Sequence, residues 1–178
     1  MALTEQRIRA CARDEELFRA LSEELQRLLP SELERQVDAF VERIQALPPG
    51  LRAMASIYQL DVSITLDDLG WHFANWHHRA YCNETLRGLA LLEAQEAADI
   101  FSQAYALATT HWETIGRLVS EDFRLFTTWY PRSELARALA PLNERIWTLR
   151  RSFPDYGLMT FWLTFARKYP EKVSAAAR

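Results

Sequence analysis

The sequence predicts an all-α protein: a single compact multi-helix domain, an orthogonal or bundle-like array of about eight to ten helices. Three observations predict this class. Only five of the 178 residues are glycine. Ala, Leu, Glu and Arg, which favour helices, are abundant, whereas β-branched residues are sparse. Apolar residues recur at intervals of three and four, and no period-two pattern typical of strands is present.

Composition sets the size and setting of this domain. With 49% hydrophobic and 25% charged residues, the chain can bury a sizeable core. We expect one domain over residues 1–173, with its central helices at about 65–119 and a frayed tail at 174–178. Apolar runs fall far short of the roughly 20 residues that cross a bilayer. The first residues lack the apolar region of a signal peptide, so a cytoplasmic protein with free thiols is expected.

Two helices are expected before residue 50. The first covers residues 4–29, and Cys11 belongs to its apolar stripe, so it is interpreted as a small core residue. The run ends at Pro30. Ser31 and Glu34 then form a capping box for a second helix, which ends at Pro48.

The central part is predicted to contain a short helix at 51–60 and three further helices. Thr65 has the side chain to cap a helix from Leu66 to about Tyr81. Asp67 and Asp68 fall in its first turn, where the helix dipole favours carboxylates. The alternative, a paired-carboxylate catalytic site, needs a second group that the sequence does not identify. Asn83 is a second cap, and the longest helix is expected at about 94–118.

The last third divides into shorter helices. Residues 120–122 form an N-terminal signature for an aromatic-rich helix, and Ser133 can cap the next one. Pro141 must kink that helix or begin a new one. A final apolar helix ends near Tyr169. Arginines interleaved with aromatic residues suggest nucleic-acid contact here, but the pI of about 5.8 and the core-like spacing argue against direct binding.

Catalytic and cofactor motifs are absent from the sequence. It contains no GxGxxG, phosphate-binding loop, GxSxG or CxxC pattern, so no cofactor is expected. His72 and His77 lie about 140° apart around a helix, and His77 and His78 about 100° apart, so no histidine pair shares a face for a metal ion. A metal site assembled from several helices, with Glu93 or Glu96, is the alternative.

Two classes of function stay open. The first is a protein-interaction module, in which a tryptophan offset from the apolar stripe, Trp71, and the acidic residues Glu15, Glu16, Glu23 and Glu24 contact another protein. Residues 1–99 carry 17 acidic and 10 basic side chains, a charge of −7, whereas residues 100–178 carry 7 and 11, a charge of +4. Solvated helix faces also produce such an asymmetry.

The second class is a small enzyme or a ligand-binding protein. The angular positions of Asp68, His72 and Asn75 place them on one polar face of the helix expected at 66–81, with His78 beside them. A deep polar cleft at these four residues would favour this class. A flat acidic face on the N-terminal helices would favour the interaction module.

One stretch resembles a known family. The order Leu69-Gly70-Trp71-His72-Phe73-Ala74-Asn75, then Tyr81, Leu86 to Leu92 and Ala94 to Ala104, resembles the core of the bacterial DNA-mimic protein family over roughly residues 50–125. The family usually has Gly-Gly-Phe where this chain has Gly70-Trp71-His72-Phe73. The resemblance implies a helical fold and a DNA-binding protein as partner, because the named member is strongly acidic and resembles duplex DNA to a regulator. The net charge here is −3.

Overall fold

A computed structural model describes residues 3–30 and 36–174, and every regular element in this part of the chain is a helix. It contains eleven α-helices, ten of them with seven or more residues, and no strand, which confirms the all-α prediction. The helices are α1 (Glu5–Ala10), α2 (Asp14–Leu28), α3 (Val37–Gln45), α4 (Pro49–Leu66), α5 (Leu69–Asn75), α6 (Arg79–Leu91), α7 (Gln95–Thr110), α8 (Trp112–Glu121), α9 (Phe123–Trp129), α10 (Glu134–Arg151) and α11 (Met159–Lys168), with 3₁₀ turns η2 (Tyr130–Arg132) and η3 (Pro170–Lys172).

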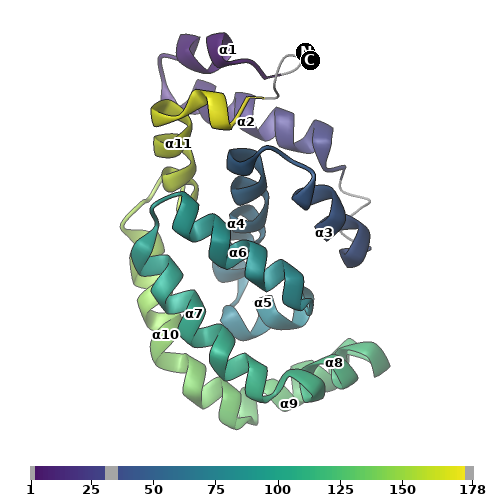
Figure 1. Ribbon diagram of the computed structural model, residues 1–178. Coiled ribbons are helices and arrows are strands. Elements are labelled where there is room, and N and C mark those ends of the chain that lie inside the picture. The colour runs from purple at the N-terminus through teal and green to yellow at the C-terminus, as the bar shows by residue number, and fades with distance from the viewer. Residues whose placement is uncertain (1–2, 31–35, 175–178) are drawn as a thin grey trace.

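Helix α4 lies at the centre, and α6 crosses it (Figure 1). The crossing is close because Gly88 has no side chain: a Cβ there would lie 2.8 Å from the Ser56 hydroxyl. Helices α7 and α10 pack side by side along one flank, whereas α8 and α9 lie at one end (Figure 1). One hydrophobic cluster includes buried side chains from Leu3 to Val173.

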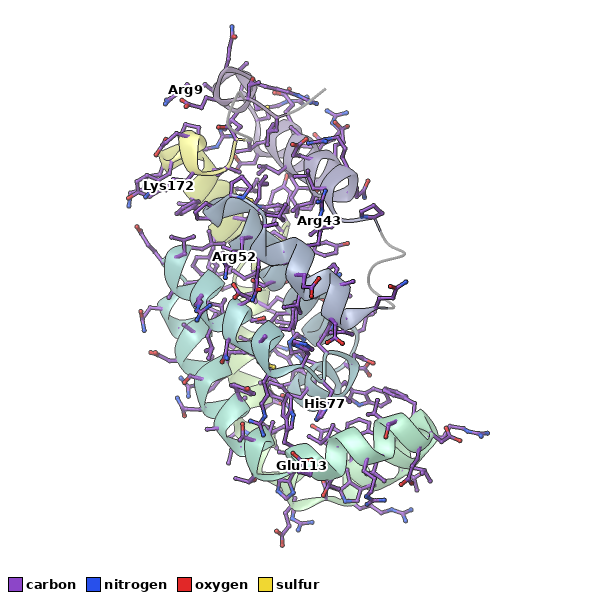
Figure 2. The ribbon with its side chains drawn as sticks, turned by 45° about the vertical axis from the view of Figure 1, so that its right-hand side comes forward. Arg9, Arg43, Arg52, His77, Glu113 and Lys172 are labelled. Carbon is purple, nitrogen blue, oxygen red and sulfur yellow. The ribbon has the colours of Figure 1, made fainter. Side chains whose placement is uncertain are left out.

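The first and last described helices meet at the opposite end of the molecule. Helix α1 packs against η3 and α11, and α2 also contacts α11. Figure 2 shows Arg9 and Lys172 at this end, far from His77 and Glu113. None of the helices in the described part of the chain combines the length and apolar character that a bilayer crossing requires.

The helix expected at 4–29 is divided in two, so that prediction was wrong. The chain leaves the helix at Cys11 and begins α2 after Arg13. The Glu16 carboxylate accepts hydrogen bonds from the backbone N–H groups of Ala12 and Arg13, at 3.1 and 3.3 Å. Those bonds satisfy donors that a continuous helix would bond internally, and they start a new helix instead.

The end predicted for the helix at 51–60 is also wrong, because α4 continues to Leu66. Its last turns contain β-branched residues, of which Ile64 is buried in the core and Thr65 is exposed. The Thr65 hydroxyl donates to the Asp61 carbonyl four residues earlier, at 2.5 Å, so Thr65 is not a cap. Asp68 takes that role for α5, since its carboxylate accepts from the Trp71 N–H at 3.0 Å.

Two further helices are shorter than expected. The helix expected at 66–81 ends at Asn75, and α6 starts after His78, whose Nδ1 accepts from the Tyr81 N–H at 3.2 Å. Asn83 therefore lies inside α6 and caps nothing. The helix expected at 94–118 breaks at His111.

One tertiary contact joins the break between α5 and α6 to the break between α7 and α8. The His77 ring stacks on Trp112 with centroids 4.1 Å apart, and its Nε2–H donates to the Trp112 carbonyl at 2.9 Å. The ring also occupies the space beside Gly116, where a Cβ would lie 2.6 Å from the His77 Cε1. The connection between α5 and α6 is thus packed against the joint between α7 and α8.

In the C-terminal third, the predicted helix starts are confirmed. Ser133 caps α10 as predicted, since its hydroxyl accepts from the Ala136 N–H at 3.0 Å. Asp122 caps α9 at the end of the predicted signature. Helix α10 continues through Pro141, so no new helix begins there. The Ser31–Glu34 capping box and residues 175–178 lie outside the described residues.

Candidate interaction surfaces

The acidic residues at the start of α2 are paired with an arginine. Arg13 Nε donates to the Glu16 carboxylate at 2.9 Å, and its Nη1 lies 3.9 Å from Glu15. The hydrogen bond from Arg13 lowers the pKa of Glu16. Both pairs are at the surface, where an ion pair contributes at most about 1 kcal/mol. They nevertheless neutralise part of the charge that the sequence count assigns to this helix.

The same holds for the second acidic pair on α2. Glu23 is exposed and accepts from Arg7 of α1 at 3.0 Å. Glu24 is buried, with 3% of its surface exposed, and both of its carboxylate oxygens accept from Arg27, at 2.6 and 3.0 Å. Of the four predicted contact glutamates, Glu24 is therefore the one that the fold withdraws from solvent.

The C-terminal cations also meet N-terminal carboxylates. Arg167 of α11 donates to Asp14 of α2 at 2.6 Å, and Lys168 donates to Glu93 at 2.9 Å. Helix α11 lies beside α1 and α2 (Figure 1), so positive residues late in the sequence are close to negative residues early in it. The charge asymmetry along the sequence is therefore partly cancelled in space.

Helix α3 carries two carboxylates without an arginine or lysine partner among the described residues. Asp38 and Glu42 are four residues apart, so they share a helix face, and both residues are exposed. The Asp38 side chain is 91% exposed and accepts from His78 Nε2–H at 2.8 Å. These two carboxylates are therefore available to a cationic partner.

Trp71 belongs to α5, and its side chain packs against α9. The centroid of its ring lies 5.6 Å from the ring centroids of both Phe123 and Phe126, and the contact with Phe126 is edge-to-face. The residue is half-buried. The tryptophan thus packs under another element and keeps part of its surface accessible.

The four residues of the alternative cleft are distributed over separate surroundings. Asp68 accepts from Tyr130 Oη–H at 2.9 Å and from Asn143 Nδ2–H at 3.3 Å. His72 is fully buried, and its Nδ1 bonds with Ser63 Oγ at 3.0 Å. Asn75 is exposed at the end of α5, and His78 bonds with α3.

Burial shifts the pKa of two of these residues. It lowers the pKa of His72 to about 3, so the ring is neutral. The Ser63 hydroxyl donates to the Gln59 carbonyl at 2.8 Å, so His72 Nδ1 carries the proton shared with Ser63. Burial also raises the pKa of Asp68, against the opposing hydrogen bonds from Trp71 and Tyr130.

Sequence reasoning missed the partners of Asp68. Tyr130 and Asn143 lie 62 and 75 residues further along the chain. A signal for the first was present in Gly70, because a glycine inside a helix indicates that a neighbour needs the space. A Cβ at Gly70 would overlap the Tyr130 ring. In the described part of the chain, no three His, Cys, Asp or Glu side chains are grouped to hold a metal ion.

The fold and these contacts define an all-helical protein whose accessible features are charged and aromatic helix faces. A family model described as DMP19-like protein matches residues 45–166. This segment is more than half of the chain, and the chain belongs to the DMP19-like family, the family of DNA mimic protein 19. No match was found among curated proteins or among solved structures. The matched segment includes α4 to α10 and most of α11, whereas α1, α2 and all of α3 except Gln45 precede it.

Proposed function

We propose that the chain binds a DNA-binding protein and presents exposed carboxylates of α2 and α3 where that protein's basic surface contacts DNA phosphates. Membership in the DMP19-like family is the observation that carries this proposal. Phosphate contacts supply much of the affinity of DNA-binding proteins, so a surface that supplies carboxylates at a similar spacing competes for the same arginines and lysines.

The positions of the carboxylates support this surface. Side chains four residues apart on a helix are about 6 Å apart, so Asp38 and Glu42 form one such step. Glu15, Glu16 and Glu23 add a second group on α2, and their surface arginine partners are weakly held, so a basic partner can displace them. In this proposal Glu24 holds Arg27 in place and makes no partner contact.

The proposal is tested by capture with the tagged full-length chain from the source cell. We expect a DNA-binding protein that is released as salt shortens the Debye length to about 8 Å and below. Asp38→Asn with Glu42→Gln, and Glu15→Gln with Glu23→Gln, should each lower the affinity about three- to tenfold at low salt, because each charge pair near a surface contributes up to about 1 kcal/mol.

A matched control separates this surface from net charge alone. Glu96→Gln with Asp99→Asn, on the exposed side of α7, changes the net charge equally and should leave the affinity within about twofold. Equal losses in the control and in the α3 variant would refute the proposed surface. A partner whose binding ignores salt but is lost in Trp71→Phe would leave an interaction module without mimicry.

A ligand-binding function at Asp68, His72, Asn75 and His78 has weaker support. His72 is fully buried, and the hydrogen-bonded partners of Asp68 and His78 lie on different elements. Small-molecule sites require polar groups that converge on one accessible cavity.

A further inference from the structure

His78 joins the acidic face of α3 to the start of α6. Its Nε2–H donates to the Asp38 carboxylate at 2.8 Å, and its Nδ1 accepts from the Tyr81 N–H at 3.2 Å, as the cap of α6. Because a backbone N–H can only donate, Nδ1 carries no proton. The hydrogen bonds therefore fix the ring as the neutral tautomer with its proton on Nε2.

The charged groups around the His78 ring belong to α3 and α6. On α3, the Asp38 carboxylate is in contact with the ring, and Glu42 lies one helical turn further on. On α6, the next residue, Arg79, places its guanidinium over the Trp112 ring, with Cζ 5.0 Å from the ring centroid. The positive end of the α6 dipole also faces the ring, because His78 caps that helix. Asp38 is thus the acidic group to which the charge of His78 couples most directly.

A proton on Nδ1 would change both contacts of His78. Histidine is the side chain whose charge ordinarily changes between about pH 5 and 8, and the His78 side chain is 26% exposed, so solvent reaches it. The added proton gives the ring a positive charge beside Asp38 and turns their hydrogen bond into an ion pair. It also places Nδ1–H opposite the Tyr81 N–H, two donors without an acceptor between them. The positive ring then offsets the negative charge that Asp38 presents.

We propose that His78 makes the binding of a basic partner by α3 sensitive to pH. With the ring neutral, Asp38 offers a full negative charge to an arginine of the partner. With the ring protonated, that arginine competes with the imidazolium for the same carboxylate, so the affinity falls as the pH falls. By linkage, a bound partner also makes His78 harder to protonate. This inference rests on the proposed function, since it concerns the regulation of the same surface.

A labelled octa-arginine peptide is the probe, because guanidinium groups keep their charge over this range of pH. Its affinity for the full-length chain at low salt should fall about three- to fivefold between about pH 7.5 and 5.5, the effect of one surface charge. His78→Asn keeps a side chain that caps α6 but cannot take up the proton, so its affinity should change less than about 1.5-fold. Burial lowers the pKa of His77, and that of His72 to about 3. His111→Asn is therefore the matched control and should keep the fall of the original chain.

The ring resonances of His78, identified by their loss in His78→Asn, report the coupling without any partner. Asp38→Asn should move the midpoint of their pH titration down by about half a unit or more, because the imidazolium loses its carboxylate. Glu42→Gln, the same charge change one turn away, should move it less. Equal shifts in these two variants would overturn the inference and leave the proposed surface standing, and so would a fall in peptide affinity that His78→Asn does not flatten. If Asp38→Asn with Glu42→Gln leaves the affinity at about pH 7.5 unchanged, the proposed α3 surface is itself wrong, and the inference fails with it.

Discussion

Gly70 is the residue at which the backbone of α5 packs directly against Tyr130. The Tyr130 ring occupies the space where a side chain would start, and its hydroxyl donates to Asp68 at 2.9 Å. The ring and the hydroxyl of Tyr130 therefore both contact the first turn of α5, at Gly70 and at Asp68. Burial and the neighbouring Asp68 carboxylate raise the pKa of Tyr130, so the hydroxyl keeps the proton that it donates.

Replacement of Gly70 by Ala should destabilise the protein although alanine favours helices. The overlap with Tyr130 costs about 1–3 kcal/mol of overpacking, and the gain in helix propensity offsets at most about 1 kcal/mol of it. Urea unfolding should give a net loss of about 1–2 kcal/mol. Tyr130→Phe, which keeps the ring, provides the comparison for the hydroxyl alone. A Gly70→Ala variant as stable as the original chain would mean that the ring is not packed there.

His72 gives the protein a pH-dependent stability. Burial depresses its pKa from 6.5 to about 3, so protons bind the unfolded chain first. The stabilisation is complete above pH 6.5 and is lost as the pH falls from 6.5 towards 3. The slope approaches about 1.4 kcal/mol per pH unit.

The variant His72→Phe removes this titration and keeps a ring among Phe73, Tyr81 and Phe101. The free energy of unfolding, measured between pH 6.5 and 4.5, should fall less steeply in the variant than in the original chain. Parallel curves would contradict the burial of a neutral histidine.

At the scale of elements, the crossing of α4 and α6 depends on a buried charge. Glu84 on α6 is 2% exposed and accepts from Arg52 on α4 at 2.5 and 2.6 Å. Gln45 and Arg87 also donate to it. Desolvation opposes the charge, but these donors lower the pKa of Glu84, so it remains ionised.

Removal of one partner should therefore be costly at this crossing. Arg52→Met leaves a buried carboxylate with fewer donors and should reduce the free energy of unfolding by about 3 kcal/mol. Arg13→Met, which removes surface pairs with Glu15 and Glu16, is the matched control and should change the free energy of unfolding far less than Arg52→Met does. Similar losses in the two variants, measured by urea unfolding, would refute the distinction.

Local signals in the sequence predicted the helical class and the caps at Ser133 and Asp122, but not the breaks between helices. Ser133 acts within its own first turn, so its role can be seen in the sequence. The breaks at Cys11 to Arg13, Trp76 to His78 and His111 contain no glycine or proline. The first break is capped locally by Glu16, whereas the other two are packed together by a tertiary contact, His77 on Trp112, which joins residues 35 positions apart.

The candidate surfaces were predictable only in part, for the same reason. The glutamates of α2 are visible in the sequence, but their arginine partners depend on the break between α1 and α2 and on where α11 packs. The polar face expected at Asp68, His72 and Asn75 assumed one continuous helix to Tyr81. Each of these side chains instead faces surroundings set by the shorter α5.

At the scale of the whole molecule, the net charge of −3 does not describe the local charge that a partner would meet. The surface of α3 is more negative than this sum suggests, and the surface of α2 is less negative than its own carboxylates suggest. Ion pairs neutralise part of the charge of α2 within the fold, whereas Asp38 and Glu42 have no arginine or lysine partner in the described residues. Attraction to a basic partner therefore depends on which carboxylates are unpaired, and the sum over the sequence does not decide it.

Competition with DNA tests the central claim most directly. A labelled duplex that contains the binding site of the captured DNA-binding protein is bound by that protein, and the chain is titrated in at low salt while fluorescence anisotropy is measured. The account predicts that anisotropy falls to the value of free DNA, and that Asp38→Asn with Glu42→Gln requires about three- to tenfold more chain for the same fall. A rise in anisotropy, which reports chain, protein and DNA in one complex, would contradict it.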